Sequence, residues 1–127
     1  MDEQAAKKLG QAVEAENTAG DTGRKQADDL LSIHFIRLTH GGKPERGEQE
    51  ATREQFLAGI QGAASNSPKR CVEFDEHPGT WSIGSECWVV RGVVTTHNKD
   101  APERDGRFRN TWVLRRDEDC RWRLVCK

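Results

Sequence analysis

Apolar residues follow a helical period in the first half of the chain. A thin apolar stripe near the N-terminus predicts a first helix, and its members are Ala5, Leu9, Ala12 and Val13. After a breaker cluster at 17–23, a short helix is predicted over about 25–31. A third helix is predicted from Thr52 to about residue 64, because Thr52 and Gln55 have the spacing of a capping box.

The remaining pattern is that of β-strands. Residues 33–39 are β-branched and aromatic and predict a strand that ends at two glycines, and residues 43–50 predict a polar loop. From Cys71 onward the chain predicts only strands, at about 70–76, 80–83, 86–97, 107–116 and 121–126. Helices followed by an antiparallel meander are typical of one α+β domain, here covering residues 1–127.

Two turns predict the register of neighbouring strands. Gly84-Ser85 fits a two-residue hairpin loop, which would place Trp81 opposite Trp88. A four-residue loop at 117–120 would place Val113 opposite Leu124. In that register the face of Arg109 would continue onto Trp122 and Leu124.

Charge argues against nucleic-acid and membrane partners. The chain holds 20 Lys and Arg against 21 Asp and Glu, a net charge of −1, so no large field of one sign attracts DNA or anionic lipid. Residues 99–127 are locally basic, but Asp117-Glu118-Asp119 would repel phosphate. No apolar run approaches the ~20 residues of a membrane-spanning helix. The polar N-terminus lacks a secretory signal, so we expect a cytoplasmic protein.

The four cysteines predict neither a disulfide nor a metal site. No pair has the spacing of a zinc site. Cys120 and Cys126, if both lie in one strand, are roughly 20 Å apart, too far for a disulfide. His34 and His40 fail as a metal pair for the same reason. We therefore expect reduced thiols and no bound metal or cofactor.

The ordered set of segments resembles the nuclear transport factor 2-like superfamily, in particular its uncharacterised SnoaL-like and ketosteroid-isomerase-like small proteins. The resemblance begins near residue 10 and is carried by the segments 19–21, 28–31, 39–42, 53–57, 88–92, 107–112 and 121–125. It implies a cone-shaped α+β barrel, in which a curved, mainly antiparallel sheet wraps around N-terminal helices and leaves a pocket. It also implies a homodimer.

The chemistry that this fold hosts elsewhere is restricted here by composition. Ketosteroid isomerase relies on a Tyr in its oxyanion hole. This chain contains no Tyr, so that apparatus is absent, and the same absence argues against the dehydratases of the fold. A cyclase-like reaction needs only an Asp or His base, and Asp75 and His34 are the candidates.

Polar residues within apolar strands are the candidates for ligand binding. Arg91 and Arg109 would anchor the polar end of a ligand, because arginine stays charged when desolvated. Trp88 and Trp122 would wall the pocket, and His40 would lie at its rim. Because antiparallel strands alternate faces, the same polar residues could instead point to water or across a dimer interface.

Two functions follow, and the sequence leaves both open. The first is a small-molecule-binding protein, with or without acid–base catalysis on an apolar substrate in the cone. The second is a non-catalytic homodimeric interaction module whose cone is filled by side chains. A cavity of ~300 Å³ or more lined by Trp or Phe favours the first, and arginines on the outer face favour the second. Four tryptophans in so small a chain predict a dimer through the outer sheet face.

Overall fold

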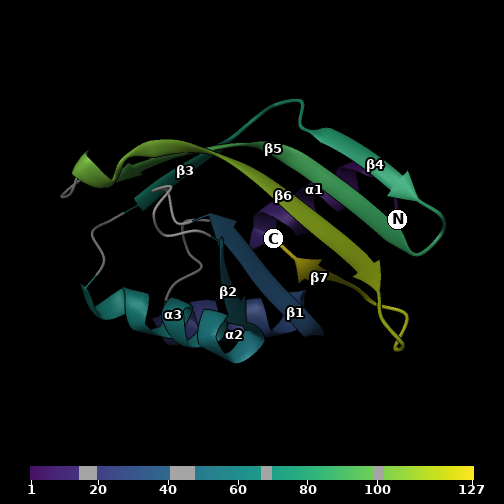
Figure 1. Cartoon of the computed structure of the whole chain (residues 1–127), viewed down its shortest axis with the longest axis horizontal. Helices are drawn as coiled ribbons and strands as arrows, with labels where there is room; N and C mark the ends of the chain where they lie inside the picture. Colours follow the sequence, from purple (N-terminus) through teal and green to yellow (C-terminus); the bar gives the residue numbers. More distant parts are fainter. Residues whose placement is uncertain (15–19, 41–47, 67–69, 99–101) are drawn as a thin grey trace.

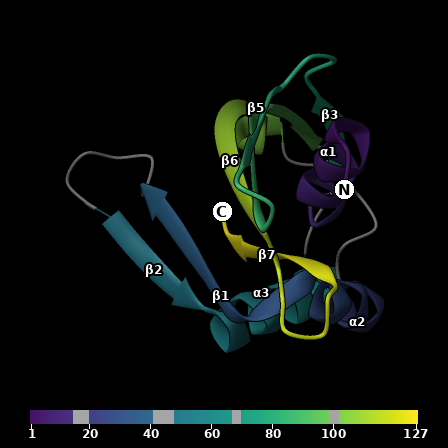
Figure 2. The same ribbon diagram turned by 90° about the vertical axis from the view of Figure 1, so that its right-hand side faces the viewer.

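Helices lie on one side of a curved seven-stranded sheet in the computed structural model (Figures 1 and 2). The structure describes residues 1–14, 20–40, 48–66, 70–98 and 102–127. Its elements, in chain order, are α1 (Glu3–Ala12), α2 (Gly20–Leu30), β1 (Leu31–His40), β2 (Glu48–Thr52), α3 (Arg53–Asn66), β3 (Arg70–Phe74), β4 (Gly79–Ile83), β5 (Cys87–Asn98), the 3₁₀-helix η2 (Pro102–Arg104), β6 (Gly106–Arg116) and β7 (Trp122–Cys126).

The sheet confirms the predicted α+β fold class. Its strand order is β2-β1-β7-β6-β5-β3, and β4 also pairs with β5. All neighbours run antiparallel except β1 and β7, which are parallel. In Figure 2, α1 lies against one face of β5 and β6, which we call the inner face, and the opposite face is the outer face.

Strict alternation along β5 and β6 divides residues between these two faces. Val90 pairs with Trp112, and both are completely buried on the inner face. Val94 and Leu114 join them there, whereas the intervening residues point outward. The core that results comprises Ala6, Val13, Ala27, Leu31, Phe35, Leu57, Val90, Val94, Trp112, Leu114 and Leu124.

The helices are held at their starts by local hydrogen bonds. The Asp2 side chain accepts a hydrogen bond from the Ala5 amide at 2.8 Å, which caps α1. The predicted capping box of α3 is confirmed, because Thr52 Oγ1 accepts from the Gln55 amide and Gln55 Oε1 accepts from the Thr52 amide. On α1 the buried stripe runs through Ala6 and Gly10 instead of Ala5, which is exposed.

Three element boundaries differ from the sequence prediction. Residues 48–50 belong to β2 and not to a loop, because they pair with the end of β1, which extends to His40. The second helix begins at Gly20, five residues before the predicted start. Gly20 has a positive φ of 67°, which glycine adopts without steric cost and which permits the turn into the helix.

Both predicted hairpin registers are wrong by one residue. Ile83 pairs with Cys87, so the β4–β5 loop has three residues and Trp81 lies opposite Val89. The β6–β7 loop spans residues 117–121, with Cys120 at a φ of 64°, and Leu124 lies opposite Leu114. A shift of one residue moves a side chain to the other face. Trp81 and Trp88 are therefore on opposite faces, and Leu124 is on the inner face.

Close packing of α1 on the sheet predicts opposite effects for two glycine substitutions. A Cβ added at Gly10 would lie 3.2 Å from Trp112 Cβ, whereas a Cβ at Gly59 of α3 would meet nothing within 4 Å. We expect Gly59→Ala to raise the free energy of unfolding by about 0.5–1 kcal/mol through helix propensity. We expect Gly10→Ala to give no gain or a loss, because α1 must move away from Trp112. Urea denaturation of both variants measures the difference, and equal stabilisation would contradict this packing.

Candidate functional site: a groove beside the β6–β7 hairpin

An irregularity in β1 opens the surface next to the β6–β7 hairpin. Leu31 pairs with Leu124 and Ile36 pairs with Cys126, so five steps along β1 are matched by two along β7. The extra residues bulge outward, which leaves Ile33 78% exposed although Leu31 and Phe35 are buried. The bulge therefore removes part of the β1–β7 ladder and presents side chains that a regular strand would pack.

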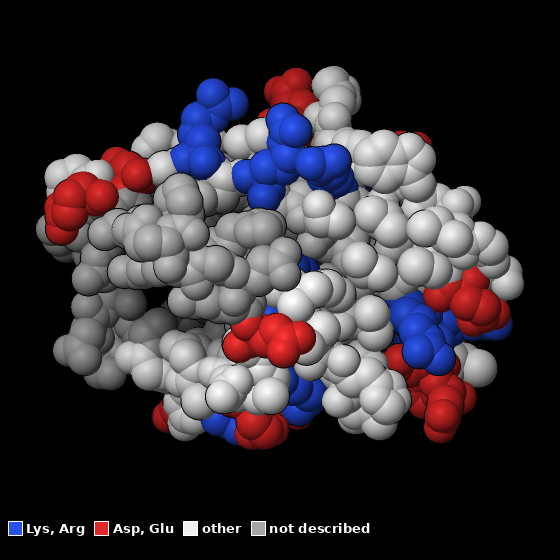
Figure 3. All heavy atoms as spheres, viewed as in Figure 1, with Lys and Arg blue, Asp and Glu red and all other residues white. Residues whose placement is uncertain are grey.

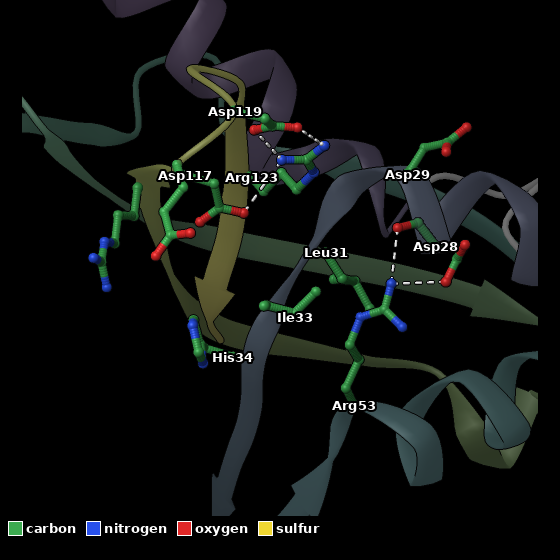
Figure 4. A pocket seen from close by; sticks show the side chains of 11 residues that line it. Asp28, Asp29, Leu31, Ile33, His34, Arg53, Asp117, Asp119 and Arg123 are labelled. Carbon is green, nitrogen blue, oxygen red and sulfur yellow. Dashed lines mark hydrogen bonds and ion pairs between the residues drawn. The ribbon is translucent and has the colours of Figure 1, made fainter.

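Two hollows flank this bulge. The first, here called the hairpin groove, has a volume of about 400 Å³, and Figure 4 shows its lining side chains. These are Asp28, Asp29, Leu31, Ile33, His34, Arg53, Arg115, Asp117, Glu118, Asp119 and Arg123. The second hollow, of about 440 Å³, shares Ile33, His34 and Arg53 with it. None of the four tryptophans is among the lining residues of either hollow.

A polar network holds the bulge against the hairpin. The buried Ser32 hydroxyl donates to Asp117 Oδ1 at 3.2 Å and accepts from the His34 amide at 3.2 Å. Arg123 donates to Asp117 at 3.3 Å and to both oxygens of Asp119 at 2.7 Å (Figure 4). The side chains of Asp117 and Arg123 are each only 15% exposed. These contacts make the wall of the groove a fixed structure.

The electrostatics of the hairpin follow from Arg123. Its hydrogen bonds, together with one from the Arg121 amide, lower the pKa of Asp119 to about 2. The same carboxylate bonds raise the pKa of Arg123 above its usual value. At the end of β6, directly before the same loop, Glu86 raises the pKa of Arg116 by accepting hydrogen bonds at 2.6 and 2.9 Å.

Arg53 forms the opposite wall of the groove. It donates to the side chain of Asp28 at 2.7 Å and to the Asp28 carbonyl at 3.0 Å, which ties the start of α3 to the end of α2. Its Nε is buried and has no hydrogen-bond partner among the described residues. A buried donor without a partner costs stability, and this one belongs to a residue that lines the groove.

A second charged pair lies where α1 ends, and no local sequence pattern predicts it. Lys127 Nζ forms an ion pair with Glu14 Oε1, and both side chains are about nine-tenths buried. Lys127 also lies 5.5 Å from the centre of the Phe56 ring. Burial lowers the pKa of Lys127 to about 8, while the Glu14 carboxylate acts in the opposite direction. This pair joins the last strand to the first helix.

The predicted ligand-binding arginines do not meet in a pocket. Arg91 lies opposite Thr111, and Arg109 lies opposite Val93, and both arginines are exposed on the outer face. Placing them inside the cone was therefore wrong, because their odd-numbered positions alternate away from Val90 and Trp112. Trp88 and Trp122 are half-buried against the core, on the inner face. The predicted common face of Arg109, Trp122 and Leu124 does not exist.

The two candidate bases have different surroundings. Asp75 Oδ2 accepts from the Val93 amide at 2.7 Å, and the Asp75 amide donates to the Val93 carbonyl. Asp75 thus forms hydrogen bonds to the part of β5 that lies between its pairing with β3 and its pairing with β4. This role is structural. His34 lines the hairpin groove, and its role as a base stays a prediction. His40 pairs with Glu48 at the end of β1, but its side chain lies outside the described residues.

Comparison with solved structures identifies the fold. The chain matches a nuclear transport factor 2-like superfamily protein from Salmonella enterica with a TM-score of 0.66 and 15% identity, covering 98% of this chain and 83% of that one. A putative aromatic ring hydroxylase from Novosphingobium aromaticivorans matches with 0.71 and 14%, covering 98% and 85%. The S. rosetta CaMKII hub matches with 0.68 and 18%, covering 99% and 93%.

These likenesses establish the fold and not an activity. No protein-family model and no curated protein matches the chain. The matches to solved structures show that the chain has the nuclear transport factor 2-like cone fold, and this fold hosts unrelated functions. Among the described residues no group of His, Cys, Asp and Glu could hold a metal ion, and no helix is long and apolar enough to cross a membrane.

The low pKa of Asp119 predicts a pH-dependent stability of the hairpin. A carboxylate whose pKa falls from 3.8 to about 2 on folding stabilises the protein above pH ~4, and this contribution is lost as the pH falls toward 2. The stability difference between the natural protein and Asp119→Asn should therefore shrink over that interval in urea denaturation. Glu118→Gln, on the same hairpin and exposed, is the control and should show no comparable change. A constant difference for Asp119→Asn would contradict the assignment.

Proposed function

We propose that the chain is a non-catalytic interaction module that self-associates through the outer face of its sheet. The observation that carries this proposal is an exposed apolar area over β4, β5 and β6. Trp81 and Ile83 are 53% and 59% exposed there. In the sheet register, Trp81 adjoins Val89 and Val113, and Ile83 adjoins Cys87. We call these five residues the apolar half of the outer face.

Self-association would remove this apolar area from water. In Figure 1, β4, β5 and β6 lie in front of α1, so Figure 3, drawn from the same side, shows the outer face. A broad uncharged region covers its right-hand part in that view. Helices α1–α3 cover the other side of the sheet (Figure 2), so a second copy is the simplest cover for these residues.

The interior supports an interaction module over an enzyme. The described inner face is occupied by large side chains, among them Trp112, Trp88 and Phe35. Arg91 and Arg109, the anchors on which an acid–base reaction would depend, are on the other face. One structural neighbour is the hub of a CaMKII, and another is a putative association domain of such a kinase from Xanthomonas campestris, which shows that assembly modules occur on this fold.

A small-molecule-binding function is the second candidate, and the hairpin groove is what favours it. The groove combines apolar Leu31 and Ile33 with His34 and the unpartnered Nε of Arg53. Screening a panel of small aromatic acids by NMR should then shift the Ile33 methyl signals in the natural protein, and less in Arg53→Met. Shifts confined to other regions would remove this candidate. A cytoplasmic location stays a prediction for either function.

Sedimentation tests self-association through the apolar half. We expect the natural protein to sediment at twice 14.3 kDa at micromolar concentration and Trp81→Ser/Ile83→Thr to sediment as a monomer. Loss of two central apolar side chains should weaken association at least tenfold, which corresponds to about 1.4 kcal/mol.

The matched control is Leu38→Thr, because Leu38 is 52% exposed but belongs to β1. This control should still form the dimer. A natural protein that stays at 14.3 kDa at every concentration would contradict the proposal. Equal weakening by the control and the double variant would place the contact elsewhere.

A further inference from the structure

Three exposed arginines form a stripe beside the apolar half of the outer face. Arg91 on β5 and Arg107 and Arg109 on β6 share this face, because all three occupy its odd-numbered positions. We call them the arginine stripe. Figure 3 shows blue side chains gathered over the upper part of β5 and β6, to the left of the uncharged region.

The sheet register gives the spacing of the stripe. Arg109 and Arg107 are two residues apart on one strand, which corresponds to about 7 Å. Arg91 lies opposite Thr111 and is therefore the diagonal neighbour of Arg109, at roughly 7–8 Å between Cα atoms. The Cα atoms that carry the three guanidinium groups thus lie at regular intervals on one face of the sheet.

None of the three has an ion-pair or hydrogen-bond partner among the described residues, whereas several other arginines of the chain pair with carboxylates. Arg24, Arg53, Arg116 and Arg123 each pair with a carboxylate at 2.6–3.3 Å. Two carboxylates lie in register with the stripe across β5: Glu73, opposite Thr95, contacts His97 at 3.7 Å, and Asp75 accepts from the Val93 amide at 2.7 Å. Like charges therefore stand side by side with nothing described between them to neutralise them.

We propose that the arginine stripe binds an acidic, extended segment of a partner protein. Alternate side chains of an extended chain are about 7 Å apart, which matches the spacing of the stripe. Arginine presents a planar fork of donors that fits a carboxylate, so two or three Asp or Glu residues at alternate positions satisfy it. Arg91 borders the apolar half, because the Trp81 ring lies against Gly79, which pairs with Arg91, whereas Arg107 and Arg109 lie further along the sheet.

A nucleic acid and a second copy fit the stripe less well. Glu73 bounds the stripe at one end, and the acidic hairpin residues 117–119 follow the other end of β6, so a long polyanion would meet repulsion on either side. A symmetric contact between two copies centred on the stripe would bring six arginines together. A short acidic segment meets neither obstacle.

Fluorescence anisotropy with a labelled peptide tests this proposal. The probe is a peptide of about ten residues with Glu at alternate positions and Ser between them. We expect it to bind the natural protein at low salt and to bind at least tenfold more weakly to Arg91→Gln/Arg107→Gln/Arg109→Gln. The control Lys8→Gln/Lys25→Gln/Arg121→Gln removes the same charge at other exposed positions and should change the affinity less than twofold.

Several outcomes would overturn the proposal. They are no binding at low salt, an equal loss in both triple variants, and tighter binding of a single-stranded oligonucleotide of similar charge than of the peptide. Circular dichroism establishes that the variants are folded. If the stripe variant does not fold, the single substitutions decide, and each should weaken binding about two- to threefold while the Lys8→Gln substitution leaves it unchanged.

Discussion

The alternation of side chains along β5 and β6 is the constraint on which the rest of this structure depends. Val90 and Trp112, directly opposite each other, are completely buried, and Gly10 brings α1 into contact with Trp112. The inner face of the sheet packs against this core. Because successive side chains of a strand alternate, every intervening residue of β5 and β6 points to the outer face. The outward set contains Val89, Val113 and the arginine stripe, and Trp81 of β4 shares their face because it pairs with Val89. The requirements of the core therefore decide which side chains the outer face exposes.

Much of the fold could be predicted from local signals, because those signals act over a few residues. The capping box at Thr52 and Gln55 and the strands after Cys71 are examples. Strand registers could not be predicted, because each depends on one loop conformation. Cys120 adopts a left-handed conformation, which its residue type does not predict. β2 forms only because the end of β1 is available for pairing.

The candidate site was harder to predict than the fold, for a reason visible around Arg91. Valines occupy both faces of β5 beside it, so the sequence there lacks the apolar–polar alternation that separates inside from outside. The hairpin groove depends on long-range contacts, such as Ser32 to Asp117, which no local pattern encodes. His34 is a polar residue in an apolar strand, and a bulge places it at a groove and not in the cone.

Self-association through the outer face of the sheet, and not binding in its interior, is the function proposed for this protein. An isotope-filtered NOE spectrum of an equimolar mixture of labelled and unlabelled chains detects such a contact. Intermolecular signals are expected to the methyl groups of Val89, Val113 and Ile83, and none to Val90 or Val94, which lie on the inner face. The absence of any intermolecular signal, or signals confined to β1 and β2, would contradict it.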